Sequence, residues 1–187
     1  MNRHPNVLDV SNAVLLIVDV QEAFRKFIPD YADLIKSISI LRDAAKILNL
    51  PVIITEQYQK GLGKTVDEII SGFIEKKFEL VEKDCFSCCG SDQFKDSLKK
   101  LGRAQIIVSG IEAHVCVNQT VHDLLVHGYK PHIIVDAISS RYQKNKEVAV
   151  QKMTMSGAIP STVEIALFEM LVQSGTDAFK AVQRLVK

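Results

Sequence analysis

The chain has 187 residues, of which 47% are hydrophobic, and this composition predicts one compact domain, residues 1–187. Its 23 basic and 22 acidic residues are spread along the chain and give a formal charge of +1, so we expect a small-molecule substrate and no nucleic-acid partner. No apolar run approaches the ~20 residues that span a bilayer, and Met1–Asp9 lacks a secretory apolar stretch, which predicts a cytoplasmic protein with no membrane partner.

The N-terminal half of the chain alternates short apolar runs with stretches of helical period. Ala13–Val18 is a run of branched and apolar residues that predicts a buried strand, and Pro51–Thr55 predicts a second. Between them, Tyr31–Leu48 carries its apolar residues on one stripe, which predicts a helix that crosses over the sheet. A short piece at Leu80–Glu82 predicts another strand, and Gln93–Leu101 predicts a further helix.

The C-terminal half repeats this alternation. The pattern predicts strands and helices at Gln105–Val108 (strand), Val115–Val126 (helix), His132–Val135 (strand), Lys144–Met155 (helix) and Ala178–Val186 (helix). Ser161 with Glu164 predicts a capping box that opens one more helix. Since strands that alternate with helices form a parallel sheet covered on both faces, the predicted fold class is α/β. We expect a three-layer α/β/α arrangement with a mostly parallel, Rossmann-like central sheet.

Three side chains with reactive chemistry follow predicted strands. Asp19 comes directly after the first strand, Lys83 after the short one, and Cys116 after Gln105–Val108, near the start of a helix. Because ligands of open parallel sheets bind at the carboxyl ends of the strands, we expect the three to share a crevice. The helix N-terminus and the Lys83 cation would lower the pKa of Cys116 and favour its thiolate. The pattern therefore predicts a reactive cysteine at Cys116.

Four motifs carry a family resemblance: Asp19-Val20-Gln21, Lys83 before Phe86-Ser87, Gly110 to Val117, and Asp136 to Arg141. Together they resemble the isochorismatase-like cysteine hydrolases, a family that includes nicotinamidases and N-carbamoyl amidases. The resemblance covers most of the chain and implies a catalytic triad. In that triad Cys116 attacks a carbonyl, Asp19 is the general base, and Lys83 orients and polarises the reacting groups.

The resemblance also implies details around the triad. It implies a cis peptide bond between Ile111 and Glu112, with the backbone N–H groups of Glu112 and Cys116 forming an oxyanion hole. It implies a homo-oligomer and no cofactor. Together with the local sequence, it indicates four residues that line the substrate pocket: Phe24, Tyr58, Phe86 and His114.

Departures from the family pattern reduce the number of candidate substrates. Isochorismatases proper hydrolyse a vinyl ether and lack the cysteine found here at Cys116, which counts against isochorismate. Nicotinamidases hold a metal with an Asp-x-His motif after the second strand, whereas this chain reads Thr55-Glu56-Gln57-Tyr58-Gln59, so we expect no metal. The resemblance favours a small amide, carbamoyl or related C–N substrate, hydrolysed through a covalent thioester, and is greatest to the subgroup whose substrates are undefined.

The four cysteines leave functions of other classes open. Cys85, Cys88, Cys89 and Cys116 are too few and too clustered for a disulfide framework, so free thiols are expected. Cys85-Phe86-Ser87-Cys88 is nevertheless a C-x-x-C motif, which keeps a redox dithiol or a zinc site as alternatives. A non-catalytic assembly protein is a further alternative, with Cys116 as core filler, Asp19 as a helix cap and Lys83 in a solvated charged stretch.

Overall fold

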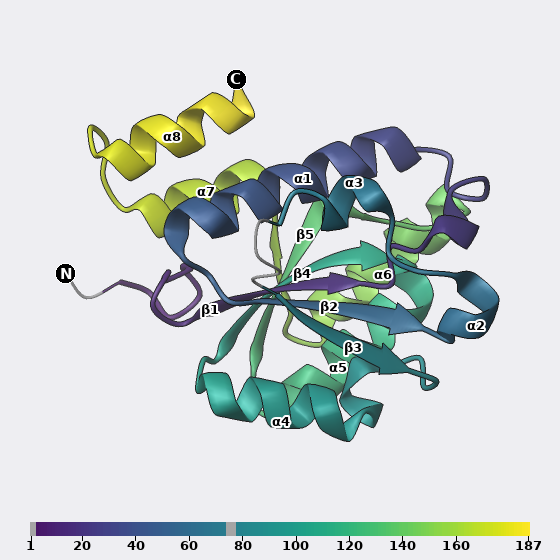
Figure 1. The fold of residues 1–187 in the computed structure, drawn as a ribbon. Helices are drawn as coiled ribbons and strands as arrows, with labels where there is room; N and C mark the ends of the chain where they lie inside the picture. Colours follow the sequence, from purple (N-terminus) through teal and green to yellow (C-terminus); the bar gives the residue numbers. More distant parts are fainter. Residues whose placement is uncertain (1–2, 74–77) are drawn as a thin grey trace.

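Six parallel strands form one sheet at the centre of the molecule. The computed structural model describes residues 3–73 and 78–187 (Figure 1). Within these ranges the strand order is β3-β2-β1-β4-β5-β6, and every neighbouring pair is parallel. The strands are β1 (Ala13–Val18), β2 (Val52–Gln57), β3 (Glu79–Lys83), β4 (Gln105–Ile111), β5 (Lys130–Ser139) and β6 (Ile159–Ser161). The predicted α/β class with a parallel central sheet is confirmed.

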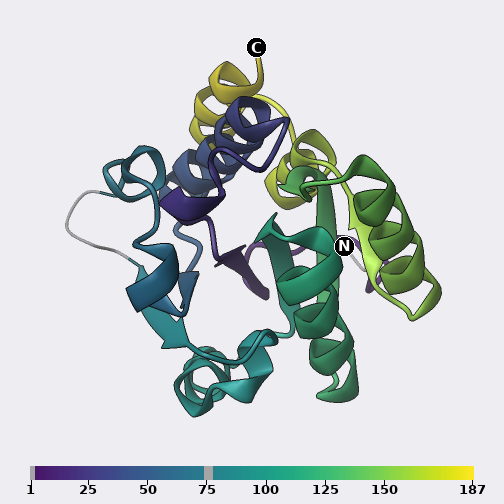
Figure 2. The same cartoon turned by 90° about the vertical axis from the view of Figure 1, so that its right-hand side faces the viewer.

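Helices cover both faces of this sheet (Figures 1 and 2). One face carries α1 (Tyr31–Leu48), α3 (Asp67–Ile70), α7 (Val163–Leu171) and α8 (Asp177–Val186), and the other carries α4 (Asp92–Leu101), α5 (Asn118–Val126) and α6 (Gln143–Met155). The short α2 (Gln59–Leu62) follows β2 directly. None of the described helices is both long and apolar enough to cross a membrane.

The central strand β1 divides the apolar core into two clusters. Leu15 and Ile17 belong to the cluster beneath α1, α7 and α8, whereas Leu16 and Val18 belong to the cluster beneath α4, α5 and α6. Successive residues of a strand point to opposite faces, so an unbroken apolar run supplies both clusters at once. The run Ala13–Val18 is accordingly buried at every position.

The chain around β6 differs from the prediction. Ser161 ends β6, where it pairs with Ile134 of β5, so it does not cap the next helix. Thr162 is the N-cap of α7, and its hydroxyl accepts a hydrogen bond from the backbone N–H of Ile165 at 3.2 Å. The predicted Ser161–Glu164 capping box is therefore wrong by one residue. The cause is a strand of three residues, which is too short to produce a recognisable sequence pattern.

Strand β4 runs further than predicted, to Ile111, and carries the chain past the end of β1. The pairing of β4 with β5 shifts register between Val108 and Gly110. Gly110 has φ 107°, and a Cβ built there would lie 2.1 Å from the carbonyl oxygen of Val18. Only glycine fits such a close approach of two backbones. This approach brings the turn after β4 next to Asp19, which follows Val18.

Candidate active site

Asp19 and Lys83 form a buried ion pair at the carboxyl edge of the sheet, the edge that faces the viewer in Figure 2. Lys83 Nζ donates to Asp19 Oδ2 at 2.7 Å, and the two side chains are 0% and 1% exposed for Lys83 and Asp19 respectively. Asp19 has φ 52°, in the left-handed region that Asp tolerates better than most residues. The structure thus contradicts two alternatives, since Asp19 does not cap a helix and Lys83 is not solvated.

Strand β2 lies between β1 and β3 and supplies further hydrogen bonds to this pair. Thr55 Oγ1 donates to Asp19 Oδ1 at 2.6 Å, and Lys83 Nζ donates to Gln57 Oε1 at 2.8 Å. A buried ion pair needs such bonds, because its Coulomb attraction alone rarely offsets the loss of hydration. Burial acts to lower the pKa of Lys83, but the Asp19 carboxylate opposes it and the pKa is raised. Lys83 is therefore held as a cation.

Cys116 lies beside this ion pair, and its thiol has a raised pKa. It belongs to a π-helical turn, η4 (Ala113–Val117), that leads into α5, and it is 6% exposed. Burial raises the pKa of Cys116, and the charge of Asp19 and a hydrogen bond to Asp19 raise it too, while Lys83 acts in the opposite direction. The predicted lowering of this pKa is wrong, because burial and the carboxylate outweigh the cation. The structure does bring all three predicted side chains together.

The turn after β4 is held by the residue that precedes η4. The peptide bond between Ile111 and Glu112 is cis. The Glu112 carbonyl accepts hydrogen bonds from the N–H groups of Val115 (3.0 Å) and Val117 (3.2 Å). Burial acts to raise the pKa of the Glu112 carboxyl, but hydrogen bonds from Arg141 outweigh this and the pKa is lowered. Glu112 is thus an ionised side chain held by Arg141 at the start of η4.

The four predicted pocket residues have different surroundings. The carbonyl of Phe86 accepts a hydrogen bond from Lys83 Nζ at 3.2 Å, and the N–H of Tyr58 donates to the Lys83 carbonyl at 2.9 Å. Both residues are more than half exposed. His114 Nδ1 lies 3.0 Å from Ser140 Oγ. Phe24, by contrast, packs against the core cluster beneath α1, whereas Cys116 belongs to the other cluster.

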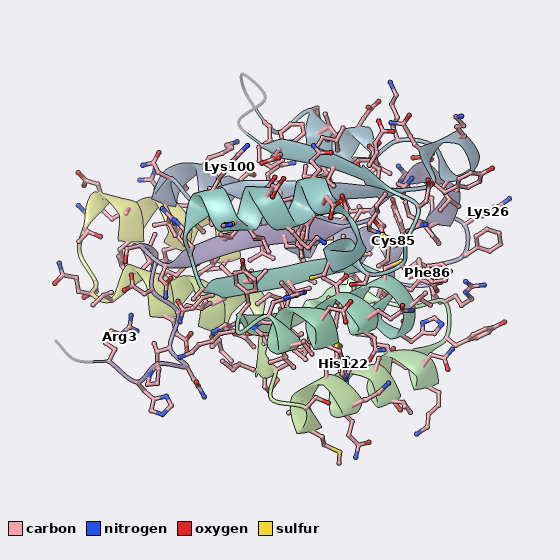
Figure 3. All side chains as sticks on the ribbon, turned by 90° about the horizontal axis from the view of Figure 1, so that it is seen from below. Arg3, Lys26, Cys85, Phe86, Lys100 and His122 are labelled. Carbon is pink, nitrogen blue, oxygen red and sulfur yellow. The ribbon has the colours of Figure 1, made fainter. Side chains whose placement is uncertain are left out.

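A cleft of about 580 Å³ opens next to β3. Its lining includes Tyr58, Lys60, Asp84 and Cys85, together with the outer side of Lys83. Figure 3 shows Cys85 and Phe86 at the carboxyl end of the sheet, away from Arg3. Because the Lys83 side chain is 0% exposed, its amine does not open into this cleft.

The end of β2 and the residues that follow it do not fit the metal site of a nicotinamidase. Glu56 Oε1 accepts hydrogen bonds from the N–H and hydroxyl of Thr65 (2.6 and 2.8 Å), and Oε2 accepts one from Gln59 Nε2 (2.7 Å). Gln57 Oε1 is bound to Lys83. Within residues 3–73 and 78–187, no group of three or more His, Cys, Asp or Glu side chains could hold a metal ion. The Asp-x-His motif of that site is missing from Thr55-Glu56-Gln57-Tyr58-Gln59.

The C-x-x-C motif does not have the properties of a redox dithiol. All four cysteines are free. Burial is the main factor that raises the pKa of Cys88 to about 12, and it does the same for Cys89. Redox-active cysteines react as thiolates and sit in electropositive, partly exposed surroundings. Cys88 is instead a buried thiol whose Sγ lies 3.8 Å from Thr55 Oγ1.

Sequence reasoning missed part of this site. In the sequence, Thr55 and Gln57 stand out only as departures from a metal motif, yet both contact the ion pair in the structure. The signal that could have identified them is their position at the carboxyl end of β2, where the rule that selected Asp19 applies equally. The pairing of Glu112 with Arg141 left no such signal, because the predicted strands end at Val108 and Val135, four and six residues before these two residues.

A parallel three-layer sheet with a buried polar site at its carboxyl edge is the architecture of the isochorismatase-like α/β hydrolases. The family model described as "Isochorismatase domain" matches residues 13–165, and the chain belongs to this family of hydrolases. The resemblance found in the sequence motifs is therefore confirmed.

Named relatives agree with this assignment. The chain is 36% identical over 180 residues to isochorismatase domain-containing protein 2 of Danio rerio, covering 96% of this chain and 89% of that protein. It is 35% identical to the secreted isochorismatase effector Isc1 of Phytophthora sojae, covering 94% and 85% of the two chains. The structure of the MAR1 ribonuclease from Caenorhabditis elegans matches with a TM-score of 0.90 and 40% identity, covering 96% and 91%.

Proposed function

We propose that this hydrolase cleaves a small amide, carbamoyl or related C–N substrate through a triad of Cys116, Asp19 and Lys83. The observation that carries the proposal is the position of Asp19, whose carboxylate accepts a hydrogen bond from Lys83 at 2.7 Å and raises the pKa of the neighbouring Cys116 thiol. A nucleophile bonded to a base, with the base oriented by a third group, is the general signature of covalent catalysis.

Acylation begins from a neutral thiol, since the pKa of Cys116 is raised. Asp19 takes the thiol proton as the sulfur attacks the substrate carbonyl carbon and the carbonyl oxygen becomes an oxyanion. The backbone N–H groups of Glu112 and Cys116 stabilise that oxyanion as it develops. Asp19 then returns the proton to the leaving nitrogen, the C–N bond breaks, and a thioester remains on Cys116.

Deacylation uses the same groups. Asp19 takes a proton from water as the water oxygen attacks the thioester carbonyl, and the C–S bond then breaks. The acid leaves and the sulfur recovers its proton from Asp19. Throughout, Lys83 keeps the Asp19 side chain correctly oriented and pairs with its negative charge, because a carboxylate buried without its cation would be strongly disfavoured.

Other reactions of the family and its neighbours have less support. Vinyl ether hydrolysis needs no cysteine, and nicotinamide hydrolysis in the family relies on a metal held by an Asp-x-His motif that is missing from Thr55-Glu56-Gln57-Tyr58-Gln59. The ribonuclease in the name of the C. elegans neighbour suggests RNA as a substrate to test. We favour a small molecule because Cys116 is only 6% exposed and the net charge is +1.

Further parts of the proposal concern the whole chain. We propose that residues 1–187 form one domain, supported by hydrogen bonds from Arg3 and Leu8 near the start to Glu169 in α7. We propose that Phe24, Tyr58, Phe86 and His114 line the pocket, that the chain forms a homo-oligomer, and that it works in the cytoplasm. Four free thiols support the last point.

A substrate panel with trapping of the intermediate tests the proposal. The panel contains small amides, carbamoyl compounds and esters, with isochorismate, nicotinamide and an RNA oligonucleotide as competing candidates. Acid quenching during turnover, followed by intact-mass and peptide analysis, should locate an acyl group on Cys116. Cys116→Ala should abolish both this adduct and turnover.

Cys85→Ser is the matched control, because Cys85 is a partly exposed thiol whose side chain lies outside the triad. It should keep both adduct and turnover. Turnover that survives Cys116→Ala at the wild-type rate would refute covalent catalysis and favour the vinyl ether reaction. Cleavage of the RNA oligonucleotide alone would refute a C–N substrate.

A further inference from the structure

Arg141, just beyond the end of β5, binds the Glu112 side chain at three points. Its backbone N–H and its Nε donate to Glu112 Oε1 at 3.0 and 3.1 Å, and its Nη2 donates to Oε2 at 2.7 Å. The planar guanidinium therefore donates a hydrogen bond to each of the two carboxylate oxygens. This bidentate geometry fixes the direction of the partner as well as its distance.

The two members of this pair have unequal burial. The Glu112 side chain is 4% exposed, whereas that of Arg141 is 50% exposed. Ordinary surface ion pairs join two mobile exposed side chains and contribute little to stability. Here one partner is fixed within the protein, and all three hydrogen bonds from Arg141 end on the Glu112 carboxylate, so they restrict the short segment of backbone that carries it. A role in holding that segment is better supported than a role in stabilising the surface.

The backbone of Glu112 is directly connected to the turn that carries Cys116. Its carbonyl accepts two hydrogen bonds from η4, the turn that carries Cys116, and Arg141 holds its side chain. The residue before Arg141 makes a parallel contact, since Ser140 Oγ lies 3.0 Å from His114 Nδ1 in the same turn. The chain after β5 thus contacts the turn after β4 at two positions, Glu112 and His114.

We propose that Arg141 is a positioning residue that acts through the Glu112 carboxylate to fix the Glu112 N–H in the oxyanion hole. This inference rests on the proposed function, in which that N–H stabilises the oxyanion formed on the substrate carbonyl. Arg141 itself touches no reacting atom. It should matter only for reactions in which Cys116 attacks a carbonyl, because only these develop an oxyanion.

Two reagents that modify the same sulfur separate this role from a general structural one. Iodoacetamide alkylates Cys116 by forming an S–C bond and expelling iodide, and no oxyanion forms. 4-Nitrophenyl acetate acylates Cys116 through a tetrahedral oxyanion that expels 4-nitrophenolate. In the alkylation the thiol proton is lost to solvent, whereas in the acylation Asp19 accepts it. We would measure both rates at Cys116 by peptide mass analysis, in a Cys85→Ser background that removes the competing thiol.

Arg141→Gln should lower the rate of acylation of Cys116 by ~10²-fold, which is the scale expected for a donor displaced by about 1 Å. The rate of alkylation should stay the same. Arg141→Lys, which keeps a cation and the backbone N–H but loses the bidentate geometry, should fall between wild type and Arg141→Gln. Glu112→Gln, which breaks the ion pair from the other side, should lower acylation similarly, and combining it with Arg141→Gln should add little.

Arg25→Gln is the matched control, since Arg25 is a comparably exposed guanidinium that binds Glu22 and Glu68. It should leave both rates unchanged. Equal losses of acylation and alkylation in Arg141→Gln would show a merely structural role and overturn the inference, as would no loss in either. If wild-type Cys116 is alkylated but never acylated, the proposed function itself fails and this inference fails with it.

Discussion

His132 on β5 should make the protein less stable in mild acid. The side chain is fully buried, and among the described residues neither ring nitrogen has a hydrogen-bond partner. Burial, with a smaller effect from the Lys130 cation, lowers the pKa of His132 from 6.5 to about 4. The folded protein therefore keeps His132 neutral at pH values where the unfolded chain has already bound a proton.

The magnitude follows from this difference in pKa. Above about pH 7.5 both states hold neutral His132, and the residue adds no pH dependence. As the pH falls below 6.5, only the unfolded state gains the proton, so the free energy of unfolding decreases by about 1.4 kcal/mol per pH unit. The loss reaches roughly 3 kcal/mol near pH 4.5, and it stops growing below about pH 4, where the folded state is protonated too.

Urea unfolding of wild type and His132→Leu, followed by far-ultraviolet circular dichroism, tests this value. The leucine variant has a similar volume and no titrating group, so carboxyl titrations common to both proteins cancel. We expect similar stability at pH 7.5 and a variant more stable by ~2–3 kcal/mol at pH 4.5. His127→Gln, at an exposed position, is the control and should follow wild type. If His132→Leu loses stability in acid as steeply as wild type, the buried neutral histidine is refuted.

Three variants of the candidate site have separate expected results. Asp19→Asn removes the charge and the hydrogen bond that raise the pKa of Cys116, so alkylation of Cys116 at neutral pH should speed up. Turnover on a verified substrate should fall ~10²–10⁴-fold, because the general base is lost. Parallel changes in the alkylation rate and in turnover would contradict the general-base role. Lys83→Met removes the cation that lowers the pKa of Cys116, so the pH for half-maximal alkylation should rise. It also leaves Asp19 buried without a partner, which should lower the free energy of unfolding by ~3–5 kcal/mol. Thr55→Val removes a hydrogen bond to the buried carboxylate and should cost about 1.5–3 kcal/mol of stability, whereas Thr55→Ser should restore most of it; equal losses in the two variants would show that packing, not the hydroxyl, matters.

The sequence was sufficient for the elements that depend on local pattern. The branched run Ala13–Val18 could only be a buried strand, and Tyr31–Leu48 carried a clear helical stripe whose observed limits agree. Since the carboxyl ends of parallel strands share one edge, strand positions alone also placed Asp19, Lys83 and Cys116 together. These inferences succeed because side-chain period and strand direction are properties of short segments.

What surrounds each side chain was decided only by tertiary structure. The sequence around Lys83 has the charge pattern of a solvated stretch, yet the folded chain buries its amine against Asp19 from a strand two places away. The pKa of Cys116 rises rather than falls for the same reason, because burial and a nearby carboxylate depend on residues far apart in the chain. The three-point contact of Arg141 with Glu112 joins residues 29 positions apart. Electrostatic and hydrogen-bonding partners act through distance in space, which no local sequence period encodes, and so only the packed sheet could decide them.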